Sequence, residues 1–434
     1  MISITSATAR SGQLRLALLA GCLLCGSAGA ETLQQAWDTA LAVDRGLKAS
    51  RENTAASASL LDAAKSARLP NVALEAGYTA LDNTPTAKVD FLGQSLQMPL
   101  AQKDSAAYRA MATLPLYTGG RIERGIDAAA AGLDAARLGE TADAQNVKLR
   151  VADAYVNVLR ASRMLKVTES HVTSLEAHAR DVTNLHEQGM VAKSDLLSVQ
   201  VALADAHQRQ LQVANGLDLA RAAYNRLLGR PLDQPVLLDD LSPEVTQVPL
   251  HVLTERALAR RSELAALAQQ IEVLRHQAAA VRGENAPQVA LSGGYGYQEN
   301  RYQVNPGQWM VTLGAKWNLF DGGVVRHRAN AVERQAAALT EQRDELASVI
   351  TLQVRQTWLD VQETKKRLIV TQSAIAQAAE NLFVVRDRYA NGLATHTEVL
   401  DAETLRTGSE SNHANALFDA ALTELRLKRA TGEL

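Results

Sequence analysis

The 434-residue sequence predicts a mainly α-helical protein of long helical hairpins, with four β-strands per chain that contribute to a transmembrane β-barrel. Three observations support this fold class. The chain contains an internal duplication, its longest segments combine an apolar heptad with an absence of proline, and shorter segments alternate apolar and polar residues over the length of a membrane strand. Only 4% of the residues are aromatic, which suits close-packed helices better than a bulky globular core.

The duplication is the clearest feature of the chain. Residues 116–229 recur 203 positions later as 319–432, with matching glycines at the start, middle and end of each copy. An upstream block, 70–78, recurs at 287–295 with a different shift of 217. Because the two shifts differ, the segments 78–116 and 295–319 must differ in length, and we expect this difference to lie in a loop.

The longest predicted helices are 121–188, which contains no proline, and 324–391, which contains neither proline nor glycine. Each would be roughly 100 Å long at 1.5 Å per residue. Their shared apolar seam comprises Val151, Val158, Leu165, Val172 and Ala179 in the first copy and Val354, Val361, Leu368, Ile375 and Leu382 in the second. We expect each helix to turn at a glycine, Gly189 or Gly392, and to be followed by a return helix about half as long.

Shorter elements complete each copy. Ser194 and Thr397, each followed by an acidic residue, are expected to cap the return helices. Further helices are predicted over 33–68 and 254–282, ahead of the strands. Between the two copies, the segment 231–249 is rich in proline and aspartate and reads as a connection wrapped around the helices.

The N-terminal segment has the features of a secretory signal. Basic residues precede an apolar run over 16–24, and Ala28-Gly29-Ala30 is an A-x-A cleavage pattern. An alternative is a lipobox ending at Cys22, which would then be lipidated. Both cysteines lie in this segment, so a chain cleaved after Ala30 has no thiol and no cysteine-based metal site. The chain therefore divides into a signal peptide (1–30), a first structural repeat (31–230), an equatorial connecting segment (231–250) and a second structural repeat (251–434).

The predicted strands carry one apolar face. The clearest example has Trp309, Val311, Leu313 and Trp317 at alternate positions, with polar residues between them, and we expect these four side chains to face lipid. A soluble sheet with one face on a core is the alternative. Because about eight strands are the fewest that close a barrel, four strands require several chains, and three chains would supply twelve.

The motifs that occur twice in the same order resemble the TolC family of trimeric outer-membrane efflux ducts. They are the strand-to-helix junctions 116–120 and 319–323, both ending in Gly-Gly, and the turn segments 188–197 and 388–400. The resemblance covers essentially all of 32–432.

This resemblance implies a twelve-stranded barrel in the outer membrane of a Gram-negative bacterium, continued by a periplasmic tunnel of twelve helices. The implied function is passive conduction for a tripartite efflux or type I secretion system. The implied partners are two further copies in a homotrimer, a periplasmic adaptor (membrane fusion) protein, an inner-membrane transporter and outer-membrane lipid. The mild net charge of −2 gives no footprint for nucleic acid, and no cofactor is implied.

The resemblance also assigns candidate sites. Glu398 and Asp401 would form carboxylate rings at the periplasmic gate, with Tyr389 holding the helices shut and Asp195 at the matching position of the first turn. The alternative for Glu398, as for Asp195, is a role at the helix N-terminus. The adaptor would dock on the turn residues Gly189, Met190, Val191, Ser194, Gly392, Leu393, Ala394 and Thr397.

Other chemistry has little support in the sequence. His171, His178 and His186 are seven and eight residues apart, whereas two ligands on one helix usually stand three or four apart, so a solvated face is expected rather than a metal site. No nucleophile–base pair or phosphate loop is present, and the chain is not expected to be an enzyme. The remaining alternative is a secreted coiled-coil scaffold of the cell envelope, which would have no use for an apolar strand face. The exported substrate is not encoded in these patterns.

Overall fold

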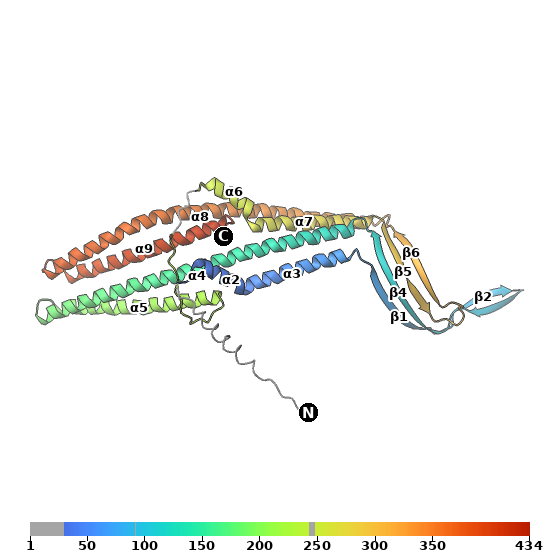
Figure 1. Cartoon of the computed structure of the whole chain (residues 1–434), viewed down its shortest axis with the longest axis horizontal. Coiled ribbons are helices and arrows are strands. Elements are labelled where there is room, and N and C mark those ends of the chain that lie inside the picture. Colours follow the sequence, from blue (N-terminus) through green and yellow to red (C-terminus); the bar gives the residue numbers. More distant parts are fainter. Residues whose placement is uncertain (1–29, 92, 243–247) are drawn as a thin grey trace, which may run out of the picture. The chain divides into compact units, whose positions relative to one another are not determined.

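The computed structural model describes residues 30–91, 93–242 and 248–434, whose helices and strands are labelled in Figure 1. The predicted signal peptide and the alternative lipidation at Cys22 lie outside these residues. The chain forms two compact units, and each takes segments from both halves of the sequence. The first contains the described residues of 1–43, 150–244 and 364–422, and the second those of 44–149, 245–363 and 423–434.

Two pairs of long helices confirm the predicted hairpins. Helices α4 (Arg121–Glu187) and α8 (Val324–Ala390) each contain 67 residues, and the return helices α5 (Lys193–Leu227) and α9 (His396–Ala430) each contain 35. The heptad seam is buried at six of its ten positions, for example at Val151 and Val354, which are 1% and 0% exposed, and is half-buried at the other four.

The duplication also appears in the backbone conformation. Eight glycines with positive φ form four pairs that stand 203 residues apart, namely Gly119 and Gly322, Gly120 and Gly323, Gly189 and Gly392, and Gly229 and Gly432. The glycines that begin and end each long helical hairpin therefore adopt the same conformation in both copies.

A four-stranded antiparallel sheet lies in the second unit (Figure 1). Its order is β1 (Asn71–Ala80), β4 (Asp104–Tyr117), β5 (Gln288–Gln298) and β6 (Gly307–Lys316), so β1 and β6 are the edges. The sequence predicted four strands per chain, and β6 contains the Trp309, Val311 and Leu313 alternation that was its clearest example. The prediction of four strands per chain is nevertheless incomplete, because β2 (Thr86–Phe91) and β3 (Gln94–Pro99) form a separate hairpin. This hairpin lies within 78–116, where the change of shift placed a possible length difference.

The predicted apolar alternation is present in the sheet. Trp309, Val311 and Leu313 are 80%, 78% and 68% exposed, and Val72 and Leu74 of β1 are exposed to the same degree. At the end of the sheet farther from the strand-to-helix junctions, aromatic rings pack across strands, with Tyr108–Tyr297 and Tyr295–Trp309 centroids 4.9 and 5.4 Å apart.

Trp317 marks the opposite end of the apolar face. It lies one residue beyond β6, and its indole N–H donates a hydrogen bond of 3.0 Å to the carbonyl of Asn285. Trp309 and Trp317 are therefore about 27 Å apart along an extended chain, close to the thickness of a hydrocarbon core. An apolar face bounded by aromatic residues at both ends is the pattern of a membrane strand.

The helices that precede the strands are each divided in two, whereas the sequence predicted continuous helices. Asp44 separates α2 (Leu33–Val43) from α3 (Arg45–Ser66), and its carboxylate caps α3 by accepting the Leu47 N–H at 2.8 Å. Arg261 separates α6 (Leu250–Arg260) from α7 (Ser262–Arg282), which ends in the 3₁₀ turn η1 (Gly283–Asn285). The Arg261 guanidinium donates to Glu263 at 3.0 Å.

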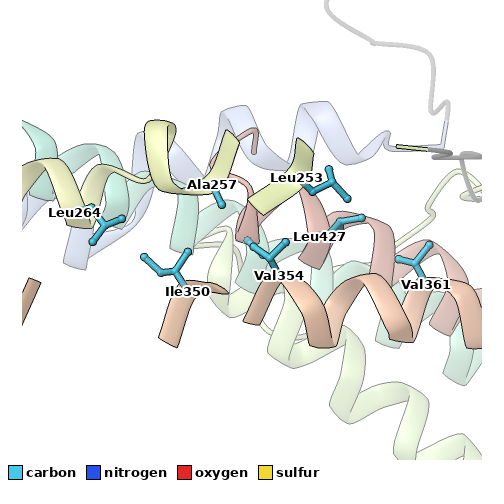
Figure 2. Close-up of a cluster of buried hydrophobic side chains, with 8 residues drawn as sticks. Leu253, Ala257, Leu264, Ile350, Val354, Val361 and Leu427 are labelled. Atoms are coloured by element: carbon cyan, nitrogen blue, oxygen red, sulfur yellow. The ribbon is translucent and has the colours of Figure 1, made fainter. Parts of the chain in front are cut away.

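Apolar packing joins these shorter helices to the long ones within the second unit. Figure 2 shows the cluster, in which side chains of α6 and α7 pack on α8 and α9. Its buried members are Leu253, Ala257, Leu264, Ile350, Val354, Val361, Leu427 and Ala430. Burial of this aliphatic surface, at about 25 cal/mol per Å², stabilises the packing of the four helices.

Candidate functional site

The hairpin tips are two copies of one helix-ending motif. The Met190 N–H donates to the Leu185 carbonyl at 2.8 Å, and the Leu393 N–H donates to the Arg388 carbonyl at 2.8 Å. The glycine before each of them has φ of 73° or 72° and donates to the carbonyl three residues earlier. This is the Schellman arrangement, which favours glycine at the left-handed position. Met190 and Leu393 consequently project from the tips and are 69% and 68% exposed.

The predicted caps of the return helices are wrong. Helix α5 begins at Lys193 after Ala192, which makes no side-chain cap, and the Ser194 hydroxyl donates only to Asp195 at 3.3 Å. Thr397 is the second residue of α9. Thr395 caps that helix instead: its hydroxyl accepts the Glu398 N–H at 3.3 Å, and the Glu398 carboxylate accepts the Thr395 N–H at 3.1 Å.

The two acidic gate candidates on α9 have different surroundings. Glu398 belongs to the capping box, and hydrogen bonds from Thr395, with a smaller effect of the Arg388 charge, lower the pKa of its carboxyl. The role of Glu398 at the helix N-terminus, one of the two interpretations of the sequence, is therefore present in the structure. Asp401 is exposed and makes no hydrogen bond or ion pair with any described residue.

Tyr389 and Asp195 lie close together near the tips. Tyr389 packs on a small cluster from α8 and α9 that comprises Leu382, Val385, Val399 and Ala402. Burial raises the pKa of Tyr389, and the negative charge of Asp195 raises it further. Asp195 stands 3.6 Å from the ring nitrogen of His396, an ion pair when that histidine is protonated. The Tyr389 hydroxyl is buried without a hydrogen-bond partner among the described residues.

The three histidines of α4 do not share a solvated face, so that expectation is wrong. His178 is 4% exposed and meets the Tyr389 ring edge-on at 5.3 Å. His171 makes a 3.0 Å hydrogen bond with Thr407, and His186 lies 3.1 Å from the Val191 carbonyl at the tip. Burial lowers the pKa of His178, which favours its neutral form. Among the described residues, no group of three or more possible metal ligands comes together.

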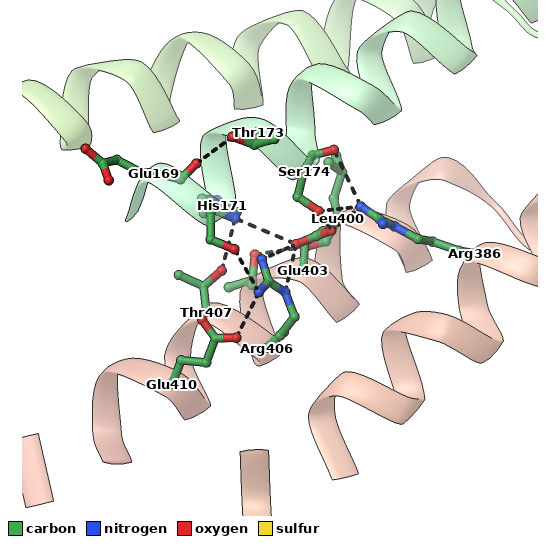
Figure 3. A network of polar contacts seen from close by, with 12 residues as sticks. Glu169, His171, Thr173, Ser174, Arg386, Leu400, Glu403, Arg406, Thr407 and Glu410 are labelled. Carbon is green, nitrogen blue, oxygen red and sulfur yellow. Dashed lines mark hydrogen bonds and ion pairs between the residues drawn. The ribbon is translucent and has the colours of Figure 1, made fainter. Parts of the chain in front are cut away.

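A polar cluster that the sequence did not indicate ties three helices together (Figure 3). Its centre is Glu403 of α9, whose side chain is 0% exposed. The Arg386 guanidinium of α8 donates to this carboxylate at 2.5 Å, and the Ser174 hydroxyl of α4 donates to the same oxygen. The Arg406 guanidinium is 3.3 Å from the other oxygen and also pairs with Glu410 at 2.8 Å.

The ionised form of Glu403 is strongly favoured. Burial alone would raise the pKa of Glu403, but the hydrogen bonds from His171 and Ser174 and the charges of Arg386 and Arg406 outweigh burial and lower it to about 2. A buried carboxylate held by two guanidinium groups resists displacement, because removal of either partner leaves an uncompensated charge.

A second carboxylate of α9 repeats this arrangement. Asp419 accepts from Arg160 of α4 and from Arg367 of α8, both at 2.5 Å, one at each carboxylate oxygen. Glu403 and Asp419 therefore each bind side chains of both α4 and α8. Two buried or partly buried carboxylates thus join α9 to the other two helices within the first unit.

Near the tips, α4 and α8 also border a hollow of about 630 Å³. Its wall includes the acidic side chains Asp181 and Asp387 and the aromatic rings of His178, Phe383 and Tyr389. The buried Nε2 of His178 has no hydrogen-bond partner among the described residues. The hollow thus combines apolar surface, two carboxylates and two unsatisfied polar atoms beside the predicted docking residues.

Comparisons with known proteins agree with this architecture. A family model described as outer membrane efflux protein matches residues 36–230 and 253–433. The outer membrane protein TolC of Escherichia coli is 22% identical over 424 residues, which cover 93% of this chain and 83% of TolC. The alkaline protease secretion protein AprF of Pseudomonas aeruginosa is 22% identical over 303 residues, or 67% of this chain and 62% of AprF.

Solved structures show the same fold. The outer membrane protein VceC of Vibrio cholerae superposes with a TM-score of 0.78 at 18% identity, covering 92% of this chain and 96% of VceC. CusC superposes with a TM-score of 0.80 at 15% identity, covering 92% of both chains. These matches confirm the predicted fold class of long helical hairpins joined to membrane strands. The chain belongs to the outer membrane efflux protein family.

Proposed function

We propose that this protein is the exit duct of a tripartite efflux or type I secretion system in the outer membrane of a Gram-negative bacterium. The observation that carries the proposal is the direct junction of a membrane-type strand with a long helix, made twice. Strand β4 ends at Tyr117 and α4 begins at Arg121; β6 ends at Lys316 and α8 begins at Val324. Substrate passes through such a duct without chemistry, and the inner-membrane pump selects it.

A homotrimer would satisfy the open edges of the sheet. In lipid, the unpaired N–H and C=O groups of β1 and β6 have no water to bind, so each edge requires another strand. With the order β1-β4-β5-β6, pairing of β6 with β1 of the next copy keeps every neighbour antiparallel. Three copies then close twelve strands, a number within the range of outer-membrane barrels.

The helices of the first unit point to the same assembly. The exposed apolar surface of this unit is concentrated on α5 and α8. Both carry exposed apolar side chains: Leu197, Val201, Leu211 and Leu219 on α5, and Ile369, Val370, Phe383 and Val384 on α8. Contact of α8 with α5 of the next copy is a head-to-tail interface, which closes into a ring.

The exposed surface of α8 is extensive. Among the described helices, α8 alone is long and apolar enough to cross a membrane by length and composition, and 17% of that stretch is buried. A neighbouring copy of the chain would cover this apolar surface and could also hydrogen-bond the polar residues between the apolar ones, which lipid could not do. The exposed apolar side chains of α8 therefore support the proposed trimer.

We assign the periplasmic gate to Tyr389, Asp195, Glu398 and Asp401, as the sequence predicted, with Asp401 as the main ring carboxylate. Asp401 could face the Asp401 side chains of the other two chains across the axis. Glu398 is instead hydrogen-bonded to Thr395 in the capping box. Three like charges at a constriction attract cations. Glu403 fixes the orientation of α9 and hence the direction in which Asp401 points.

The adaptor would dock on the two tips. Met190 and Leu393 offer exposed apolar side chains, and the hollow between α4 and α8 lies beside them. Apolar projections next to a hollow that carries two carboxylates and the Arg386 guanidinium suit a helical hairpin with apolar and polar residues at its end. Docking there would act directly on Tyr389 and the gate.

One experiment tests the duct as a whole. We expect the purified protein to require detergent, to form a trimer by native mass spectrometry and to conduct ions in planar bilayers. A monomer that is stable without detergent would contradict the proposal. Complementation of a strain that lacks its outer-membrane efflux protein then tests transport, with Gly392→Val as a tip variant that still inserts into the membrane.

A further inference from the structure

Glu31, the residue that follows the predicted cleavage site, is held by its side chain. Its carboxylate receives two hydrogen bonds from the Arg230 guanidinium, at 2.6 and 2.9 Å, and one from the Tyr224 hydroxyl at 3.0 Å. The two-point contact with arginine is the strongest kind of ion pair in proteins. The side chain is 17% exposed, so the pair is shielded from most of the solvent.

The backbone of Glu31 is held as well. Its N–H donates to the Leu237 carbonyl at 2.8 Å, and its carbonyl accepts from the Tyr155 hydroxyl at 2.7 Å and from the Asp239 N–H at 3.0 Å. Residue 31 thereby forms a parallel bridge with Leu238 of the connecting segment. Every hydrogen-bonding group of the residue has a partner, so Glu31 is tied to the fold through both its backbone and its side chain.

The pocket is built from buried parts of α4 and α5. Tyr155 of α4 and Tyr224 of α5 are both 0% exposed, and their rings meet edge to face at 6.0 Å. Burial raises the pKa of both phenols, so both remain neutral donors at physiological pH. The two hydroxyls are therefore fixed in position and point to the same residue.

The charge around the pocket is unbalanced. The carboxylates of Glu31, Asp239 and Asp240 all act on the Tyr155 hydroxyl, whereas Arg230 is the guanidinium bound at the site. A positive group on the nitrogen of Glu31 would reduce this imbalance. Cleavage of the chain just before Glu31 creates such a group, because an α-amino group is mostly protonated at neutral pH.

We propose that this pocket is a binding site for the mature amino terminus, and that its ligand is an N-terminal glutamate with a free α-ammonium. The group arises when a signal peptidase hydrolyses the Ala30–Glu31 bond: water supplies the hydroxyl of the new Ala30 carboxylate, and the nitrogen of Glu31 takes up protons. The ammonium keeps the hydrogen bond to the Leu237 carbonyl and adds positive charge beside a site on which the carboxylates of Glu31, Asp239 and Asp240 act. This inference rests on the export of the chain to the envelope, which the proposed function requires.

The first test is the intact mass of the protein purified in detergent. We expect a mass that begins at Glu31 and that is unchanged in Cys22→Ser. A diacylglyceryl mass on Cys22, or a different first residue, would overturn the proposal. This outcome is independent of transport, because a channel that conducts normally with another N-terminus would contradict only the pocket, whereas a correctly processed protein that forms no channel would contradict only the proposed function.

The second test separates the ammonium from the carboxylate. One glycine inserted between Ala30 and Glu31 keeps the cleavage pattern and the Glu31 side chain but converts the ammonium to a neutral amide. We expect Tm to fall by about 2–4 °C and the segment 231–240 to be cleaved faster by a protease. Glu31→Gln should have a larger effect, and Asp38→Asn, an exposed carboxylate on the adjoining helix, should have none. Wild-type stability of the insertion variant would refute the role of the ammonium.

Discussion

The substitution Glu403→Gln tests whether this buried carboxylate holds the proposed gate closed. Glutamine has nearly the shape of glutamate but no charge, so Arg386 loses its carboxylate partner while the packing is kept. The lowering of the Glu403 pKa to about 2 corresponds to roughly 3 kcal/mol in favour of the folded, ionised arrangement. Loss of one partner from a buried ion pair costs about 3–5 kcal/mol in general, which agrees with this magnitude.

If the contacts of Glu403 with α4 and α8 are absent from the open tip, about 3 kcal/mol raises the ratio of open to closed channels about a hundredfold. Single-channel recording in planar bilayers measures this ratio directly. The matched control is Glu410→Gln, which removes a partly exposed partner of Arg406 and should change the ratio by less than about threefold. A closed-state lifetime of Glu403→Gln equal to that of the wild type, in a trimer of normal stability, would refute the reasoning.

The same residue predicts a pH dependence. Because the folded pKa of Glu403 is depressed, its stabilising contribution is complete above the pKa of an unfolded glutamate, about 4.3, and is lost as the pH falls toward about 2. The wild-type channel should therefore stay closed from pH 7 to about pH 4.5 and open increasingly below that. Glu403→Gln should lack this component, and a wild-type conductance that is constant down to pH 2 would contradict the assignment.

Three further predictions concern the tips, the gate and the membrane sheet. Gly392→Val, and to a lesser degree Gly189→Val, should abolish efflux but not insertion, since a β-branched residue at φ near 72° is strained by about 1–3 kcal/mol; normal export of a known substrate at normal protein level would show that the tips are not the docking surface. Asp401→Asn should reduce cation preference in reversal-potential measurements, and unchanged selectivity would return Asp401 to a surface carboxylate. Val311→Lys, on the side predicted to face lipid, should lower the yield of detergent-stable trimer, at a cost of about 2–4 kcal/mol, whereas Met310→Lys on the opposite face should be tolerated.

The long helices could be predicted because their signals are local and repeated. The segments 121–188 and 324–391 correspond to α4 and α8 within one residue at each end. A heptad and the absence of proline describe a helix without reference to its partners. The break at Asp44 also had a local signal, an N-capping residue, whereas the break at Arg261 depends on contacts with Glu263 and with the end of α9.

The hairpin β2–β3 was missed although its signal was present. Ala87 and Val89 alternate with polar residues on one strand, Leu96 and Met98 do so on the other, and Gly93 with φ of 80° lies between the strands. Alternation on both sides of a glycine is a hairpin pattern. The duplication gives no indication of this hairpin, because only the longer strands have counterparts in the other copy.

Glu403 could not have been found from the sequence. A single acidic residue on an amphipathic helix is normally exposed, and its burial here depends on Ser174, which is 229 positions away in the chain. Asp401, by contrast, could be proposed from a motif, because it lies shortly after the glycine turn of the hairpin. Pairwise contacts between distant helices are set by packing and not by local pattern.

The two copies of the helical hairpin differ at the charged residues near the proposed gate. At the shift of 203, Glu403 corresponds to Gln200, Arg386 to Thr183 and Asp401 to Ser198. The proposed trimer would place six hairpins of similar backbone around one axis, but only three of them would carry the charged residues. The backbone of the proposed trimer would have approximate sixfold symmetry, whereas its charged side chains would have only threefold symmetry. In each chain the α4–α5 hairpin could then stay in place while the α8–α9 hairpin moves. The channel would open by the movement of three hairpins rather than six.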